Sequence, residues 1–226
     1  MNDDGTSASG HRARLRQRLL EQGPDTLLDH ELIEFLLSLV IPRVDTKPQA
    51  KALIRDFGGI GPLLAADGEA LLRYGLSERA AAAIKIAEAS ALRMLKSEII
   101  NRPVLSGWQA VLDYLHADME HRDVERVRVL HLNGKNVLIR DELVSEGSID
   151  QAAVYTREVI RRALDLGSAA LILVHNHPSG DPAPSKQDIE LTRHIAAAGK
   201  PLGVIVHDHI VIGHNSHSSL RSMGLL

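Results

Sequence analysis

The chain has 226 residues, of which 44% are hydrophobic and 24% charged, and its formal net charge is −3. This length allows one large domain or two small ones, and the composition is that of a globular protein rather than a disordered one. Cysteine is absent, which excludes disulfides, thiol nucleophiles, zinc ribbons and the cysteine-ligated nucleobase deaminases. Any transition metal must therefore be held by His, Asp or Glu.

Charge and aromatic content argue against a dedicated nucleic-acid binder. Neither half of the chain departs far from neutral, and one Trp, three Tyr and two Phe are too few for a base-stacking platform. No apolar run approaches the roughly 18 residues that a membrane-spanning helix needs. Residues 1–10 are polar and acidic and lack the pattern of a signal peptide. We expect a disordered tail over residues 1–10 and a cytoplasmic protein with no membrane partner.

Residues 11–100 are rich in Ala and Leu and repeat apolar side chains with the period of an α-helix. This pattern predicts an all-helical domain over residues 11–100. Pro103 and Gly107 then interrupt the periodicity, so we expect a linker over residues 101–107.

Residues 108–226 alternate helical and extended patterns, which predicts a mixed β-sheet with flanking helices and an α+β fold for the chain. The expected helices cover residues 108–119, 156–167 and 186–198. Two strands flank Asn133-Gly134, a pair typical of a two-residue hairpin turn. Further strands are expected in AALILV, LGVIV and HIVIG, at residues 169–174, 202–206 and 209–213.

The segment HNHPSGDPAPSKQD, residues 175–188, follows the apolar strand ALILV. His175 and His177 lie two positions apart and therefore face the same side of the strand. Pro178 ends the strand, and the turn after it returns the chain so that Asp188 enters from the first turn of a helix. Two imidazoles and a carboxylate, with a fourth position left for water, are typical of catalytic zinc. Alternatively, Ser185 and Asp188 form an ordinary helix cap and the histidines face solvent.

H-x-H-P-S-G followed by P-x-S-x-x-D resembles the signature of the JAMM (MPN+) metallohydrolases, whose sheet is similar to that of cytidine deaminases. Residues 103–226 closely resemble the bacterial RadC family, and the first hundred residues resemble, more loosely, the helical domain that precedes it. The resemblance implies His175, His177 and Asp188 as zinc ligands, with Ser185 near the developing oxyanion. It also implies hydrolysis of peptide or isopeptide bonds in a protein substrate, and a link to DNA repair.

The family requires an upstream glutamate that deprotonates the attacking water. Glu125 leads the strand ERVRVLHL, and period-two alternation places it on the same side as Val127 and Val129, hence inward. An inward carboxylate is costly unless it is paired or functional, although Glu125 could also start the strand in solvent. Glu142 and Glu146 are the alternatives for the base.

Other histidines carry weaker signals. His30 and Glu34 form half of a zincin motif, but the apolar residues among them indicate a structural core helix. The resemblance covers DHIVIG, so we expect Asp208 and His209 to support the site through hydrogen bonds to a metal ligand. His207 and His209 also repeat the i, i+2 spacing, which leaves a second metal as an alternative.

Gly75-Leu76-Ser77 resembles the hairpin of a helix-hairpin-helix element, and GGIG at residues 58–61 could be its companion. Such hairpins grip DNA phosphates through backbone N–H groups, and arginines between residues 12 and 18 could add charge. We therefore expect Gly75 and Ser77 as DNA contacts, weakly supported by the charge, with a helical domain packed only by Ala and Leu as the alternative.

Three classes of function follow. The first is a JAMM-type zinc metallohydrolase, and the second is a DNA-associated accessory protein whose metal site is structural or regulatory. A metal-dependent nuclease is the third, and it would require more carboxylates around its ions than these residues provide. The ligand set favours the first.

Overall fold

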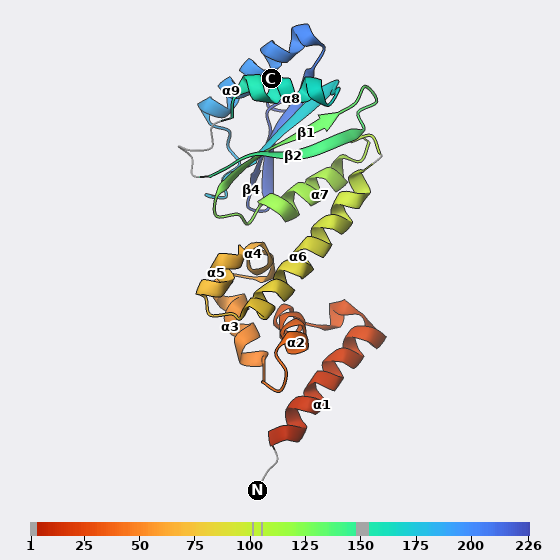
Figure 1. Cartoon of the computed structure of the whole chain (residues 1–226), viewed down its shortest axis with the longest axis vertical. Coiled ribbons are helices and arrows are strands. Elements are labelled where there is room, and N and C mark those ends of the chain that lie inside the picture. The colour runs from red at the N-terminus through yellow and green to blue at the C-terminus, as the bar shows by residue number, and fades with distance from the viewer. Residues whose placement is uncertain (1–3, 101, 105, 148–153) are drawn as a thin grey trace. The chain divides into compact units, whose positions relative to one another are not determined.

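The computed structural model describes residues 4–100, 102–104, 106–147 and 154–226, with side chains from residue 10 onward. The chain divides into two compact units, Met1–Ala91 and Leu92–Leu226. In Figure 1 the first contains only helices, and the second contains a sheet with helices packed on it, so we call them the helical unit and the sheet unit. The expected α+β fold, a helical part followed by a mixed sheet, is confirmed. None of the described helices is long and apolar enough to cross a bilayer.

The helical unit packs around a core that includes Leu37, Leu53 and Leu71, all with no exposed surface. Its elements are α1 (Asp4–Gln17), a π-helical turn (Arg18–Gln22), a 3-10 turn (Pro24–Thr26), α2 (Asp29–Val40), α3 (Lys47–Phe57), α4 (Ile60–Ala65), α5 (Gly68–Arg73) and the start of α6 (Glu78–Ile99).

The expected tail over residues 1–10 is wrong from residue 4 onward, because α1 begins at Asp4. Residues 1–3 lie outside the described residues. Gly and Ser dominate this stretch and have poor helix propensity, and no apolar stripe marks it, so the sequence pattern contained no signal for a helix there.

The boundary between the units also differs from the expected one at residue 100. Helix α6 continues without a break, and Leu95 and Ile99 in its last turns pack in the core of the sheet unit. Two residues of the expected linker are part of the sheet unit: Val104 is 2% exposed in the same core, and Pro103 forms a β-bridge with Val137. Residues 101 and 105 lie outside the described residues. Helical periodicity predicts a helix but not which core receives its apolar side chains.

The described part of the sheet unit forms one sheet with strand order β2-β1-β3-β4-β5. The β3–β4 pair is parallel and the other neighbouring pairs are antiparallel. The strands are β1 (Glu125–Leu132), β2 (Leu138–Gly147), β3 (Ala170–Asn176), β4 (Ile205–Gly213) and β5 (Ser216–Ser219). The helices are α7 (Trp108–Met119), α8 (Thr156–Asp165) and α9 (Lys186–Gly199), followed by a 3-10 turn (Lys200–Leu202).

Two local expectations need correction. The hairpin between β1 and β2 is confirmed, but its turn runs from Asn133 to Val137, and Asn136 rather than Gly134 has a positive φ, of 58°. The side chain of Asn133 accepts hydrogen bonds from two backbone N–H groups and stabilises this wider turn. The two strands expected at 202–206 and 209–213 are one strand, β4. A β-bulge at His207 shifts the register, and the pairing of β4 with β3 continues on both sides of it.

Each face of the sheet has its own core. Leu130 and Ile172 belong to the cluster beneath α7, whereas Val129, Leu171 and Leu173 belong to the cluster that includes residues of α8 and α9. Strand β3 is buried along its whole length, which explains why ALILV is apolar without alternation. His175 lies on the same side of β3 as Leu171 and Leu173, and so it faces α9.

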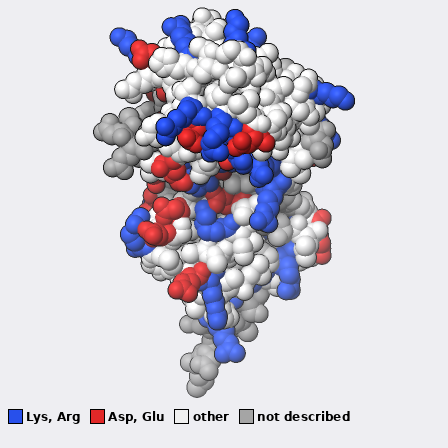
Figure 2. All heavy atoms as spheres, turned by 45° about the horizontal axis from the view of Figure 1, so that its top comes forward, with Lys and Arg blue, Asp and Glu red and all other residues white. Residues whose placement is uncertain are grey.

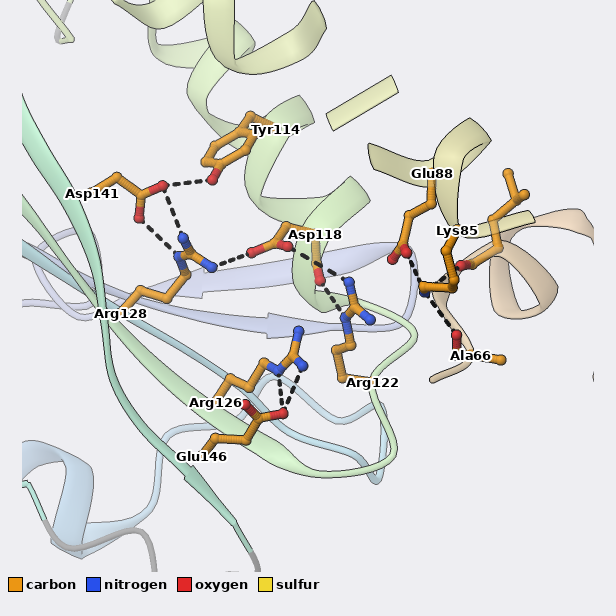
Figure 3. Close-up of polar contacts among 11 residues, drawn as sticks. Ala66, Lys85, Glu88, Tyr114, Asp118, Arg122, Arg126, Arg128, Asp141 and Glu146 are labelled. Atoms are coloured by element: carbon orange, nitrogen blue, oxygen red, sulfur yellow. Dashed lines mark hydrogen bonds and ion pairs between the residues drawn. The ribbon is translucent and has the colours of Figure 1, made fainter. Parts of the chain in front are cut away.

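Charges of both signs are interspersed on the face of the molecule in Figure 2, but one group lies inside the sheet unit (Figure 3). Asp141 on β2 has no exposed side-chain surface and accepts hydrogen bonds from Lys96, Tyr114 and Arg128. Arg128 on β1 also donates to Asp118 on α7. Burial by itself would raise the pKa of Asp141, but the bonds from Arg128 and Lys96 outweigh it and the pKa is lowered. This network fixes β1 and β2 against α6 and α7.

We predict that Asp141→Asn lowers the free energy of unfolding of the sheet unit by about 3 kcal/mol at pH 7, because it leaves Arg128 buried with only one of its two carboxylate partners, Asp118. Since the folded pKa of Asp141 is lowered, its contribution is present above the unfolded pKa of about 3.9 and disappears as the pH falls through the folded pKa. Urea unfolding, followed by the fluorescence of the single Trp, Trp108, measures both effects. Glu146→Gln on the same strand breaks a more exposed ion pair with Arg126 and is the control. An equal loss in the two variants would contradict this role for Asp141.

Candidate metal centre

The three residues predicted as metal ligands meet where β3 ends and α9 begins. His175 Nε2 lies 2.9 Å from His177 Nε2. Asp188 Oδ1 lies 3.4 Å from His175 Nε2, and Asp188 Oδ2 lies 3.7 Å from His177 Nε2. One ligand atom from each residue therefore lies within 4.8 Å of the others, a grouping that occurs once among the described residues.

These donors suit a borderline divalent metal. Two imidazole nitrogens and one carboxylate oxygen are the set that catalytic zinc sites use. His177 Nδ1 lies 2.7 Å from the carbonyl oxygen of Asp181, and because a carbonyl only accepts, the proton is on Nδ1 and the lone pair of Nε2 faces the site. Burial would raise the pKa of Asp188, but the neighbouring His175 and His177 rings hold it far below its ordinary value. Asp188 is therefore an anion, as a ligand must be.

Asp188 also caps α9, so the cap predicted as the alternative is present, and its geometry is compatible with Asp188 as a metal ligand. Ser185 N donates to Asp188 Oδ2 at 2.7 Å, and Asp188 N donates to Ser185 Oγ at 3.2 Å. The cap orients the carboxylate, and Oδ1 is the oxygen nearer to His175. Because Ser185 Oγ accepts in the cap, its own hydroxyl proton remains available to a ligand in the cavity.

The turn between His177 and Asp188 packs against the β4–β5 hairpin. Gly180 has a φ of 83°, and a Cβ there would lie 2.4 Å from the ring of His214. A Cβ on Gly213 would lie 2.4 Å from the carbonyl oxygen of Gly180. Both positions therefore need glycine for the turn to pack. The ring of His214 packs against this turn.

Glu125 lines the same cavity of about 410 Å³ as the three donors and Ser185. The adjacent Asp188 carboxylate, and to a smaller extent the negative charge of Glu125, raise the pKa of His177. The two alternatives for the base are engaged elsewhere. Glu142 pairs with Arg162 at 2.8 Å, and Glu146 pairs with Arg126 at 2.6 Å. Geometry therefore favours Glu125 among the three glutamates.

Of the two residues expected to support the site, only His209 contacts a ligand. His209 Nε2 lies 2.7 Å from His175 Nδ1, and burial lowers the pKa of His209 to about 3, so the ring is neutral. The expectation for Asp208 is wrong, because its carboxylate accepts from Ser219 and from the backbone N–H of Arg221 instead. Neighbouring residues of a strand face opposite sides of the sheet, and Asp208 faces away from the centre.

The i, i+2 pair of His207 and His209 does not form a second metal site. The bulge at His207 breaks the alternation, and His207 Nε2 lies 2.7 Å from Asn136 Oδ1. The half-zincin motif is structural, as predicted. Glu34 is 2% exposed, and one of its oxygens lies 2.8 Å from His11 Nε2.

The predicted DNA contacts lie in the turn between α5 and α6. Gly75 has a φ of 104°, and Ser77 Oγ accepts from the backbone N–H of Ala80 at the start of α6. Gly58 and Gly59 in GGIG have φ values of 83° and 141° at the turn between α3 and α4. Both segments therefore form short turns that join two helices, and their role as DNA contacts stays a prediction.

Sequence patterns missed Asn176, the residue between the two histidines. Its side chain is fully buried, accepts from Arg126 N at 2.8 Å and donates to the carbonyl of Val124 at 3.1 Å. These two backbone groups flank Glu125. The β1–β3 pairing ends at Val127 and His175, so the Asn176 amide takes the place of further backbone pairing and sets Glu125 beside the ligands.

We expect Asn176→Leu, which keeps the volume and removes both hydrogen bonds, to loosen the start of β1. A lost buried hydrogen bond costs about 1–3 kcal/mol, so amide hydrogen exchange over residues 124–127 should accelerate about tenfold or more. Mass spectrometry of peptides from this segment measures the change, and peptides from α7 in the same variant are the internal control. Unchanged exchange at 124–127 would show that the amide does not hold Glu125.

A mixed sheet that presents two histidines at a strand end and an aspartate at the next helix defines a JAB domain of the JAMM/MPN type. Residues 105–225 match the family described as the RadC-like JAB domain. The chain is 48% identical over 213 residues to a UPF0758 protein from Rhodobacter capsulatus, covering 94% of this chain and 100% of that protein. It is 47% identical over 217 residues to a UPF0758 protein from Ruegeria pomeroyi, covering 96% and 97%. The chain belongs to the RadC family.

Proposed function

We propose that the sheet unit is a zinc-dependent hydrolase of JAMM type that cleaves an amide bond, either peptide or isopeptide, in a protein substrate. The observation that carries this proposal is the convergence of two imidazole nitrogens 2.9 Å apart, the Asp188 carboxylate and Glu125 on one cavity. A structural zinc site is usually closed by four protein ligands, whereas this group holds three donors among the described residues and opens to a cavity. The set has too few carboxylates to favour a nuclease.

Each residue has a distinct task in this chemistry. His175, His177 and Asp188 would hold the zinc ion, which, when bound, would lower the pKa of a water to about 7 and polarise a carbonyl group. Glu125 accepts the proton of the attacking water and later delivers it to the leaving amine. Ser185, whose oxygen is already used in the helix cap, donates its hydroxyl proton to the substrate oxygen as negative charge develops there.

Metal content and turnover, measured on the same variants, test this proposal. Wild-type protein should contain about one zinc per chain, because one three-donor site is present. Asp188→Asn keeps an oxygen for the cap and loses the charge, so it should lose zinc. Glu125→Gln should keep zinc and lose at least about a hundredfold in hydrolysis of quenched-fluorescence peptides or lysine isopeptides.

Ser185→Ala is the control that separates capping from metal binding, because it weakens the cap without removing a ligand. It should retain zinc while turnover falls. Zinc-free wild-type protein, or full turnover in Glu125→Gln, would contradict the proposal.

A DNA-associated accessory role is the second candidate, and the two glycine-containing turns of the helical unit favour it. The arginines of α1 contribute unequally. Arg12 donates to the carbonyl of Val44 and Arg18 pairs with Glu31, whereas Arg14 and Arg16 are exposed. On the face shown in Figure 2 charges of both signs are interspersed, so a DNA contact on that face would be local rather than spread over a basic surface.

If the helical unit binds duplex DNA, the double variant Arg14→Glu and Arg16→Glu should weaken binding about tenfold at low salt, since phosphate contacts dominate such affinity. Fluorescence anisotropy with a labelled duplex measures it on the full chain. The matched control reverses two exposed lysines of the sheet unit, Lys135 and Lys200. Equal losses in both variants would indicate only nonspecific attraction, and the DNA role of α1 would then fail.

A further inference from the structure

A series of hydrogen bonds leads from His175 through His209 and Thr192 to the backbone of another predicted metal ligand, Asp188. His175 Nδ1 lies 2.7 Å from His209 Nε2, and His209 Nδ1 lies 2.6 Å from Thr192 Oγ1. Thr192 Oγ1 in turn lies 2.5 Å from the main-chain oxygen of Asp188. His209 and Thr192 are each 1% exposed, so bulk water does not reach them to replace a missing partner.

The final carbonyl sets the direction of every bond in this series. The Asp188 oxygen only accepts, so Thr192 must use its single hydroxyl proton there. Thr192 Oγ1 then has only lone pairs for His209, and the proton between them belongs to His209 Nδ1. His209 Nε2 is therefore an acceptor, and the proton between the two histidines belongs to His175 Nδ1. This leaves a lone pair on His175 Nε2.

We propose that Thr192 and His209 are positioning residues that hold His175 in the tautomer whose Nε2 lone pair faces the metal centre. The inference rests on the proposed function only in assigning that centre to His175, His177 and Asp188. His177 reaches the same tautomer independently, through the carbonyl of Asp181. The two Nε2 atoms, 2.9 Å apart, thus present lone pairs that repel each other and that a shared cation converts into two ligand bonds.

The arrangement has a specific consequence for the three ligands. The series of hydrogen bonds returns to the site where it begins. The main-chain oxygen of Asp188 accepts the hydrogen bond from Thr192, and the side chain of Asp188 lies 3.4 Å from His175 Nε2. Removing the Thr192 hydroxyl leaves His209 Nδ1–H without an acceptor. His209 relieves this by moving its proton to Nε2, and His175 must then carry its own proton on the atom that binds metal.

Zinc affinity of the full chain, measured by chelator competition, tests the proposal. Thr192→Val should weaken zinc binding about 10–100-fold, the range typical of lost outer hydrogen bonds to a ligand histidine. Thr192→Ser keeps the hydroxyl and should bind like wild type. Thr46→Val is the matched control, since Thr46 is also a buried threonine whose hydroxyl donates to a carbonyl, that of Glu34 in the helical unit. It should leave zinc affinity unchanged.

A double-variant comparison separates this role from general packing. Because Thr192 acts only through His209, adding Thr192→Val to His209→Phe should cause no further loss of zinc affinity. Additive losses, or wild-type affinity in Thr192→Val, would overturn the proposal while leaving zinc binding by the wild-type chain, and hence the proposed function, intact.

The tautomers can also be measured directly on the metal-free wild-type protein, so that the result does not depend on whether a variant folds. Long-range ¹H–¹⁵N spectra of the metal-free wild-type protein should show His209 and His175 protonated on Nδ1 and not on Nε2. A proton on His209 Nε2 would overturn the proposal. If the wild-type protein bound no zinc, the proposed function would fail. The hydrogen bonds of Thr192 and His209 would then have no role in metal binding, whatever the spectra show.

Discussion

The close approach of two imidazole nitrogens, His175 Nε2 and His177 Nε2, is the constraint around which the sheet unit is arranged. Like atoms with lone pairs do not approach to 2.9 Å unless the surroundings hold both rings in place. Strand β3 is buried on both faces and holds His175 rigidly. The turn after Pro178 holds the ring of His177 through the carbonyl oxygen of Asp181. The other parts of the site follow from the need to hold these two rings and a carboxylate together.

Much of that support comes from groups that serve the fold and the site at once. The cap of α9 uses one oxygen of Asp188 and so orients the other toward His175. The Asn176 amide ends the β1–β3 pairing and in the same contact fixes the backbone on either side of Glu125. Substitutions in such groups will change stability and ligand geometry together, which is why conservative variants separate the two effects better than truncations.

The opposite face of the sheet contributes at longer range. Arg128 on β1 is fixed by Asp141 and Asp118, and these contacts tie β1 to its neighbouring strand and to α7. Since β1 begins with Glu125, this buried network anchors the strand that carries the expected base. The charges are satisfied inside the network, so they stabilise the fold without contributing to the cavity.

The sequence by itself determined the fold class, the hairpin, the strand before H-x-H and the three residues that meet at its end. These rest on local rules, namely apolar periodicity, strand alternation and the turn after Pro178, which act over a few residues. Alternation also predicted that Glu125 faces inward, and it is the reason Asp208, the neighbour of His209, faces away. Only the tertiary structure decided that α6 ends in the sheet unit, that Asn176 bonds the backbone on either side of Glu125, and that Thr192 contacts His175 through His209. The side-chain hydrogen bonds of Asn176, and those that link Thr192 to His175 through His209, join residues 17 to 52 positions apart, and their partners are set by packing rather than by any local pattern.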